Sequence, residues 1–242
     1  MNSIEISGLS FAYNNTTVLD VGDLTIKVGE RVFLFGPSGS GKTTLLSLIT
    51  GILPARQGIL RVLGEDLVSM KTSARDHLRG NRMGYIFQMF NLLPYLTVME
   101  NIVLPCRMNK ARAARISGDL ETVAAELAER LGIGALLSRR ATELSVGQQQ
   151  RVAAARSLIG NPDLIIADEP TSALDADYRE SFLDLLFENT SKTGASILFV
   201  SHDRSLANLF DRSISLPEIN RAYSAPADQP NRKPATKGRS KK

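Results

Sequence analysis

The sequence has few of the residues on which several classes of protein depend. It contains one cysteine, Cys106, and two histidines, His77 and His202. A single cysteine excludes an internal disulfide framework and fits a reducing compartment, and two histidines argue against a histidine-rich metal site. No stretch approaches 18 uninterrupted apolar residues, so we expect no segment to span a bilayer. The first five residues lack a basic region followed by an apolar run, so we expect no secretory signal.

The overall composition is that of a soluble globular protein, with 43% hydrophobic and 22% charged residues among 242, enough for one large domain or two small ones. The formal charge of +4 arises at the C-terminal end. Six Lys or Arg residues and one Asp after residue 221 give this tail +5, so the first 221 residues carry −1. We therefore expect a folded domain over residues 1–221 without a nucleic-acid partner, followed by a basic, disordered tail over 222–242.

A glycine-rich segment between two apolar runs organises the chain. Residues 31–35 favour a strand, and residues 44–49 suit the start of a buried helix. Glycines between them allow backbone N–H groups to form an anion nest, and the helix N-terminus adds the positive end of its dipole. Lys42 offers a charge for the β- and γ-phosphates, and Thr43 a hydroxyl for Mg²⁺. The spacing predicts a phosphate-binding loop consisting of Gly36, Pro37, Ser38, Gly39, Ser40, Gly41, Lys42 and Thr43, followed directly by Thr44.

Strand and helix signals alternate along the rest of the chain. The runs 164–167 and 196–200 are continuously apolar, as in strands that are covered on both faces. The alternation predicts an α/β fold with a mostly parallel sheet, an N-terminal part of strands and turns, and a helical insertion at about 90–160. Further strands are expected near 4–9, 25–28, 58–64 and 83–87, and helices near 120–131, 146–158 and 183–187.

Two adjacent carboxylates, Asp168 and Glu169, follow the buried run 164–167. Phosphoryl transfer needs an acid that holds Mg²⁺ at the end of the strand beside the phosphate loop, and Asp168 fits this role. Glu169 is placed to orient and polarise the attacking water. The alternative is a solvated strand end, but the pairing with a phosphate loop favours the functional interpretation.

Two further polar residues end predicted strands: Gln88 follows 83–87, and His202 comes two residues after 196–200. The carboxyl ends of parallel strands face one ligand crevice. We therefore expect His202 within reach of a γ-phosphate and Gln88 within reach of Mg²⁺ and the attacking water. Tyr13, ahead of a turn, is either a core residue or a flat platform for a base, and the residue pattern alone favours the core.

Together these motifs resemble the nucleotide-binding subunits of ABC transporters over roughly residues 1–216. Leu144–Gln148 is similar to the family's signature motif and 172–175 to its D-loop, and the seven motifs occur in the family order. The resemblance implies the P-loop NTPase fold of ABC type, with an N-terminal antiparallel part and a helical subdomain. It also makes Tyr13 the adenine platform. The implied catalytic residues are Glu169, His202, Gln88 and Lys42, the implied metal ligands are Thr43, Gln88 and Asp168, and the cofactors are ATP and Mg²⁺.

The resemblance further implies a head-to-tail homodimer with two ATP molecules in its interface. The phosphate loop and the carboxylates of one subunit would then face Ser145, Gly147 and Gln148 of the other, with Asp175 contributing to the same interface. Ser145 precedes a helix, so the helix N-terminus would point at the γ-phosphate. Hydrolysis removes this bridging charge and lets the dimer open.

Within the family, segments 82–94 and 97–105 are similar to the lipoprotein-releasing and macrolide-exporting group, which serves membrane permeases. The resemblance thus implies a peripheral subunit on the cytoplasmic face of the inner membrane. Three departures stand out: Val146 replaces the usual glycine of the signature, Ala141 stands where a proline often precedes it, and residues 216–219 replace the usual Asp-Gly turn. We expect the last change to alter the final hairpin.

The main alternative is a soluble ABC-type ATPase in translation or DNA repair. Translation factors of this superfamily usually carry two cassettes, and repair proteins separate their two Walker motifs by long coiled coil; this chain does neither. The sequence also suggests where a permease would dock, because the segment after Gln88 is almost entirely apolar. Large apolar surface usually marks a partner site, so we expect Phe90, Leu93 and Tyr95 to line a docking groove, the alternative being a satellite core.

Overall fold

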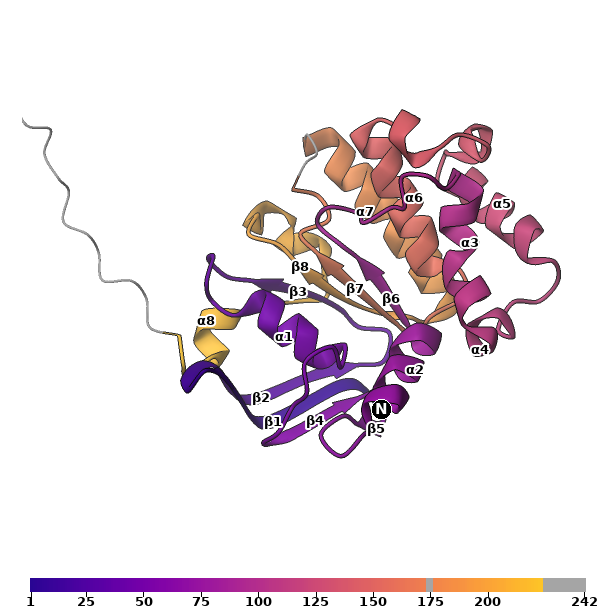
Figure 1. The fold of residues 1–242 in the computed structure, drawn as a ribbon. Coiled ribbons are helices and arrows are strands. Elements are labelled where there is room, and N and C mark those ends of the chain that lie inside the picture. The colour runs from indigo at the N-terminus through magenta and orange to yellow at the C-terminus, as the bar shows by residue number, and fades with distance from the viewer. Residues whose placement is uncertain (173–175, 224–242) are drawn as a thin grey trace, which may run out of the picture.

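The computed structural model, which describes residues 1–172 and 176–223, contains two β-sheets (Figure 1). The antiparallel sheet has the strand order β2-β1-β4-β5, and the parallel sheet has the order β6-β7-β8-β3-β9. These sheets confirm the expected α/β class and the antiparallel N-terminal part. The first sheet consists of β1 (Asn2–Tyr13), β2 (Thr16–Lys27), β4 (Ile59–Val62) and β5 (Glu65–Asp66), and the second of β3 (Arg31–Phe35), β6 (Met83–Ile86), β7 (Leu164–Asp168), β8 (Ser196–Val200) and β9 (Arg212–Ser215).

Helices cover the parallel sheet on both faces, with α1 lying between the two sheets and a group of helices on the other side (Figure 1). The expected helix 146–158 is observed as α6 (Val146–Leu158), and the helix expected at 120–131 is α5 (Leu120–Arg130). The other α-helices are α1 (Lys42–Ile49), α2 (Thr72–Arg82), α3 (Val98–Met108), α4 (Lys110–Ala113), α7 (Ala176–Thr193) and α8 (Leu216–Ile219), and 3-10 turns cover Gly134–Leu136, Ala141–Glu143 and Arg204–Leu209.

Two hydrophobic cores lie on the two faces of the parallel sheet, and the strands of the sheet contribute side chains to both. In β7, Leu164 and Ile166 belong to the core that faces α1 and the antiparallel sheet, whereas Ile165 and Ala167 belong to the core beneath α3, α5, α6 and α7. All four side chains are fully buried. Successive strand residues point to opposite faces, so a continuous apolar run is required when both faces are covered.

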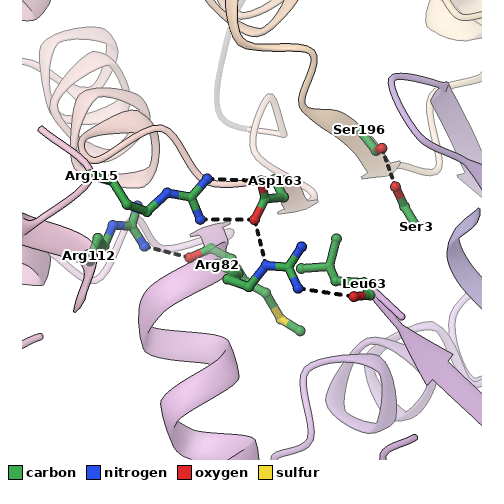
Figure 2. Close-up of polar contacts among 8 residues, drawn as sticks. Ser3, Leu63, Arg82, Arg112, Arg115, Asp163 and Ser196 are labelled. Carbon is green, nitrogen blue, oxygen red and sulfur yellow. Dashed lines mark hydrogen bonds and ion pairs between the residues drawn. The ribbon is translucent and has the colours of Figure 1, made fainter. Parts of the chain in front are cut away.

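A cluster of arginines joins the helical segment to the parallel sheet near the start of β7 (Figure 2). Arg112 of α4 is 2% exposed and donates hydrogen bonds to the carbonyls of Met83, Ser157 and Ile159 at 2.6 to 2.8 Å. Beside it, Asp163 accepts hydrogen bonds from Arg115 and from Arg82 at 2.7 to 2.9 Å. These hydrogen bonds hold together segments that are distant in the sequence, and they do so close to the start of β7.

The structure bears on three narrower expectations. The strand expected at 25–28 is the end of a longer strand, β2. The usual final hairpin is altered, as expected: among the described residues β9 is followed by the short helix α8, and Asn220 then makes an isolated bridge to Val21. No helix within residues 1–172 and 176–223 is long and apolar enough to cross a membrane.

Candidate nucleotide-binding site

The phosphate loop runs from the end of β3 to the start of α1. Gly39 and Gly41 have φ values of 79° and 99°, a left-handed conformation that glycine adopts without strain. A Cβ on Gly41 would also come within 2.8 Å of Leu19, so glycine is required there for two reasons. Gly41 caps α1 without a side-chain hydrogen bond. The first N–H groups of α1 therefore remain available to an anion.

Lys42 lies over the loop that precedes it. Its Nζ donates hydrogen bonds to the carbonyl oxygens of Gly36 at 2.7 Å and Pro37 at 3.1 Å. The ammonium group is thus held beside the loop glycines, where a phosphate group would meet it.

One cleft of about 510 Å³ brings most of the predicted site together. Gln88, Asp168, Glu169 and His202 come from the carboxyl ends of three strands and face the loop, as the sheet topology requires. The cleft is completed by Val18, Ser38, Gly39, Gly41, Lys42, Thr43 and Thr44.

Asp168 is the last residue of β7 and accepts a long hydrogen bond, 3.4 Å, from the hydroxyl of Tyr85. Burial raises the pKa of Asp168, the neighbouring Glu169 raises it further, and Tyr85 and Lys42 oppose both effects. Burial beside Asp168 likewise raises the pKa of Tyr85, so this hydroxyl stays a donor at neutral pH. The hydroxyl of Thr43, the amide of Gln88 and the carboxylate of Asp168 are oxygen groups of the kind Mg²⁺ prefers, and they share one cleft.

Glu169 turns the chain away from the sheet immediately after β7. It has a φ of 48°, unusual for a residue with a side chain, and is 8% exposed. Its Oε2 lies 2.7 Å from Nδ1 of His202, which follows β8. A strained backbone that points a buried carboxylate at a histidine is typical of functional sites. The pair gives the cleft a base whose orientation is fixed.

The signature residues lie outside this cleft. Ser145 caps α6 by accepting a hydrogen bond from the Gln148 N–H, and the Gln148 side chain accepts one from the Ser145 N–H, which forms a capping box. Ser145, Gly147 and Gln148 line a separate hollow with Gly132 and Phe182. Within the described chain, the predicted ATP contacts are therefore divided between two places.

Comparisons with known proteins agree with this geometry. The sequence pattern of the family described as "ABC transporter" matches residues 19–172, more than half of the chain. The chain belongs to this family. It is 41% identical to the lipoprotein-releasing system ATP-binding protein LolD of Anaeromyxobacter dehalogenans, with 88% of this chain and 90% of that protein covered. It is 38% identical to the ABC transporter ATP-binding protein YvcR of Bacillus subtilis, with 90% and 85% covered.

Solved structures of the family are also similar to this chain. The dimeric ABC transporter cassette MJ0796 has a TM-score of 0.76 at 31% identity and covers 88% of this chain and 93% of its own. A second MJ0796 dimer, in a post-hydrolysis state bound to ADP and Pi, has a TM-score of 0.77, also at 31% identity, with the same shares of both chains covered. The ABC fold and ATPase activity predicted from the sequence are thus confirmed, and the LolD relatives confirm the expected likeness to the lipoprotein-releasing group.

Tyr13, the expected adenine platform, is not among the residues that line the cleft. Tyr13 ends β1, is 46% exposed and meets Phe11 edge to face at 4.9 Å between ring centroids. Because its side chain is this exposed, Tyr13 is not a core residue, and its contact with adenine remains a prediction. Asp175 lies outside the described residues.

The apolar segment after Gln88 is only partly a surface. Phe90 is 6% exposed and belongs to the core beneath the helices, so its expected place in a docking groove is wrong. The backbone at Phe90 is left-handed, with a φ of 58°, and the ring lies in the core. Leu93 is half-buried, whereas Tyr95 is 69% exposed and Met89 80%.

Sequence reasoning missed two residues at the site. Val18 lines the cleft from β2, and Tyr85 reaches Asp168 from β6. The signal for Tyr85 was present, because it is a polar side chain in a short strand that pairs with β7. Nothing local distinguishes Val18, since its place depends on how β2 passes the phosphate loop.

Proposed function

We propose that two copies of this chain close on two ATP molecules and thereby drive a separate membrane permease, of the export or mechanotransmission type. The observation that carries this proposal is the division of the ATP contacts. The phosphate-loop cleft and the hollow at Ser145 are separate in one chain. Two chains arranged head to tail would place the capped end of α6 from one against the cleft of the other. The similar cassette MJ0796, which has been solved as a dimer, supports the formation of a dimer.

Each residue of the cleft has a distinct task in hydrolysis. Lys42 and the loop N–H groups bind the phosphates, while Thr43, Gln88 and Asp168 would hold Mg²⁺, which neutralises charge on the phosphate oxygens. Glu169 orients the water that attacks the γ-phosphorus and accepts its proton, as the bond to the β–γ bridging oxygen breaks. His202 holds the Glu169 carboxylate through the 2.7 Å contact and faces the γ-phosphate.

The docking surface for the permease is proposed around Leu93 and Tyr95. Tyr95 is exposed, lies seven residues after Gln88 and so connects a partner surface to the nucleotide cleft. Aromatic residues are favoured at interfaces. The names of the similar LolD proteins, which refer to a lipoprotein-releasing system, support a permease partner. The chain would then be a peripheral subunit on the cytoplasmic face of the inner membrane.

The dimer is tested with Glu169→Gln. This change removes the base but keeps the side chain's size, so we expect hydrolysis to fall by a factor of about 10² to 10⁴. ATP binding should persist, and size-exclusion chromatography with Mg-ATP should show a stable dimer. Lys42→Ala is the control that should show no dimer at the same ATP concentration. Near-normal turnover by the glutamine variant would contradict the role of Glu169.

Docking is tested with Tyr95→Glu, beside Val28→Glu as a matched charge change at another exposed apolar residue, 55% exposed between β2 and β3. We expect Tyr95→Glu to abolish copurification with an integral membrane protein while the ATPase of the free subunit persists. Val28→Glu should preserve both. Retention of copurification by Tyr95→Glu would place docking elsewhere, and failure to copurify any membrane protein with the unaltered chain would favour a soluble ATPase.

A further inference from the structure

The segment that replaces the family's final turn lies behind the phosphate loop. After α8, Asn220 forms an antiparallel bridge with Val21, and the Arg221 N–H donates to the carbonyl of Asp20 at 2.8 Å. Pro217, in α8, touches the start of the loop, because a Cβ on Gly36 would lie 3.1 Å from Pro217 Cδ. Residues 216–222, which we call the brace, therefore connect β2 to the loop, and none of them lines the nucleotide cleft.

The side chain of Asn220 is the centre of this brace. It is 1% exposed and uses its full hydrogen-bonding capacity. Its Nδ2 donates to the carbonyls of Ser40 and Val18, both at 3.0 Å. Its Oδ1 accepts from the N–H groups of Asp20 at 2.9 Å and of Ala222 at 3.1 Å. One carboxamide thus joins the phosphate loop, β2 and the C-terminal segment.

The bond to Ser40 determines how the loop presents its next N–H group. In a planar trans peptide the C=O and the following N–H point in opposite directions. Because Asn220 holds the Ser40 carbonyl toward the brace, the Gly41 N–H points to the opposite side, and Gly41 lines the cleft. Gly41 is also the residue with the left-handed φ of 99°, where the peptide plane is otherwise free to rotate.

We infer that Asn220 is a positioning residue for nucleotide phosphates: it fixes the Ser40–Gly41 peptide so that the loop is shaped before the nucleotide arrives. Preorganised donors bind more tightly because no ordering cost remains on binding. This inference rests on the assignment of Gly36–Thr43 as the phosphate loop. On this inference, the segment that replaces the family's final turn contributes to nucleotide binding, and residues 216–222 belong to the site.

The test measures ADP binding with Mg²⁺ by calorimetry, because ADP carries the phosphates without allowing hydrolysis. Asn220→Ala should weaken ADP binding about tenfold, the effect of one lost hydrogen bond and a freed peptide. The matched control is Asn189→Ala: Asn189 is 6% exposed and donates to the Leu185 carbonyl at 2.7 Å, but it lies on α7 away from the loop. This control should leave ADP affinity within twofold of that of the unaltered protein.

A second variant and a second readout separate positioning from general stability. Asn220→Leu keeps roughly the volume of the side chain but loses all four of its hydrogen bonds, including the one to Ser40, without burying a charge; its ADP affinity should fall at least as far as that of the alanine variant. Hydrogen exchange in residues 36–44 without nucleotide should rise in both Asn220 variants and not in the control.

The possible results separate a failure of the inference about Asn220 from a failure of the phosphate-loop assignment on which it rests. Lys42→Ala tests the loop itself and should weaken ADP binding more than any Asn220 variant. If Lys42→Ala weakens binding but both Asn220 variants bind within twofold of the unaltered protein, the inference is overturned and the loop assignment stands. If Lys42→Ala also leaves ADP affinity unchanged, the assignment of the loop fails, and the inference with it.

Discussion

Replacing Arg112 with methionine should destabilise the protein without touching the nucleotide cleft. Arg112 comes from α4 and binds three backbone carbonyls that belong to β6, to the end of α6 and to the residue that follows α6. Burial lowers the pKa of Arg112 to about 10, so the guanidinium group is still charged at pH 7. Methionine fills the space of the arginine stem but leaves these buried carbonyls without donors.

The magnitude follows from two opposing effects. Hydrogen bonds from a charged group contribute about 1.5–3 kcal/mol each, which gives a gross loss of roughly 4–9 kcal/mol for three. Removal of a buried charge returns several kcal/mol of desolvation cost. We expect a net loss of about 3 kcal/mol in the free energy of unfolding. With a urea m-value of about 3 kcal/mol/M, the unfolding midpoint would fall by about 1 M.

The assay is urea unfolding followed by circular dichroism, with Arg107→Met as the matched control. Arg107 lies on the neighbouring helix α3 and pairs with Glu121 at 3.0 Å, but both side chains are about half exposed. An exposed ion pair contributes about 0.5 kcal/mol or less, so the control should hardly move the midpoint. Equal shifts for the two variants would refute the argument that the three buried carbonyls, rather than the charge, hold α4 in place.

Three further predictions concern pH and the signature. Tyr85→Phe removes a hydrogen bond that lowers the pKa of Asp168, so the acid limb of the ATPase pH profile should move to higher pH; an unchanged limb would exclude Asp168 as the titrating group. Asp163→Asn should destabilise at pH 7, where the paired carboxylate is ionised. Burial raises the pKa of Asp163, but hydrogen bonds from its two arginines lower it more, so stability is present above the ordinary Asp value near 4 and is lost as the pH falls through the lower folded value. Asp163→Asn and the unaltered protein should therefore converge in urea unfolding as the pH falls from the ordinary Asp value through the lower folded pKa. Val146→Gly should preserve or raise ATPase activity, since the β-branched side chain is 48% exposed at the start of α6 and could crowd a partner subunit; a sharp loss would show that valine is needed for packing.

Local sequence signals predicted the parts of the fold that local physics determines. The run 164–167 reads as a strand covered on both faces because each residue must suit one of two cores, and β7 has this arrangement. The cleft could also be predicted from the sequence. A strand, a glycine-rich loop and a helix follow one another, and the parallel strands bring Gln88, Asp168 and His202 to one edge of the sheet. These positions follow from chain order and sheet direction alone.

The remaining features depend on contacts between distant segments. Asn220 gives no local sign that it will bond to Ser40, which lies 180 residues earlier. Phe90 was predicted to be at the surface because the apolar run that contains it follows Gln88 directly, but the ring packs among helices that are distant in the sequence. The polar helix α2 was missed for a different reason: only Arg75 and Leu78 of its side chains are buried, so it has too few apolar residues to stand out in the sequence.

The backbone at Phe90 shows how the two halves of the molecule are joined. Arg156, in the last turn of α6, donates hydrogen bonds to the carbonyls of Phe90 and Asn91, two residues with positive φ. Ser145 caps the other end of α6. A single helix therefore carries the signature residue at one end and grips the segment after Gln88 at the other. Because Ser145 and Arg156 stand on the same helix, α6 links the signature directly to the segment that follows Gln88.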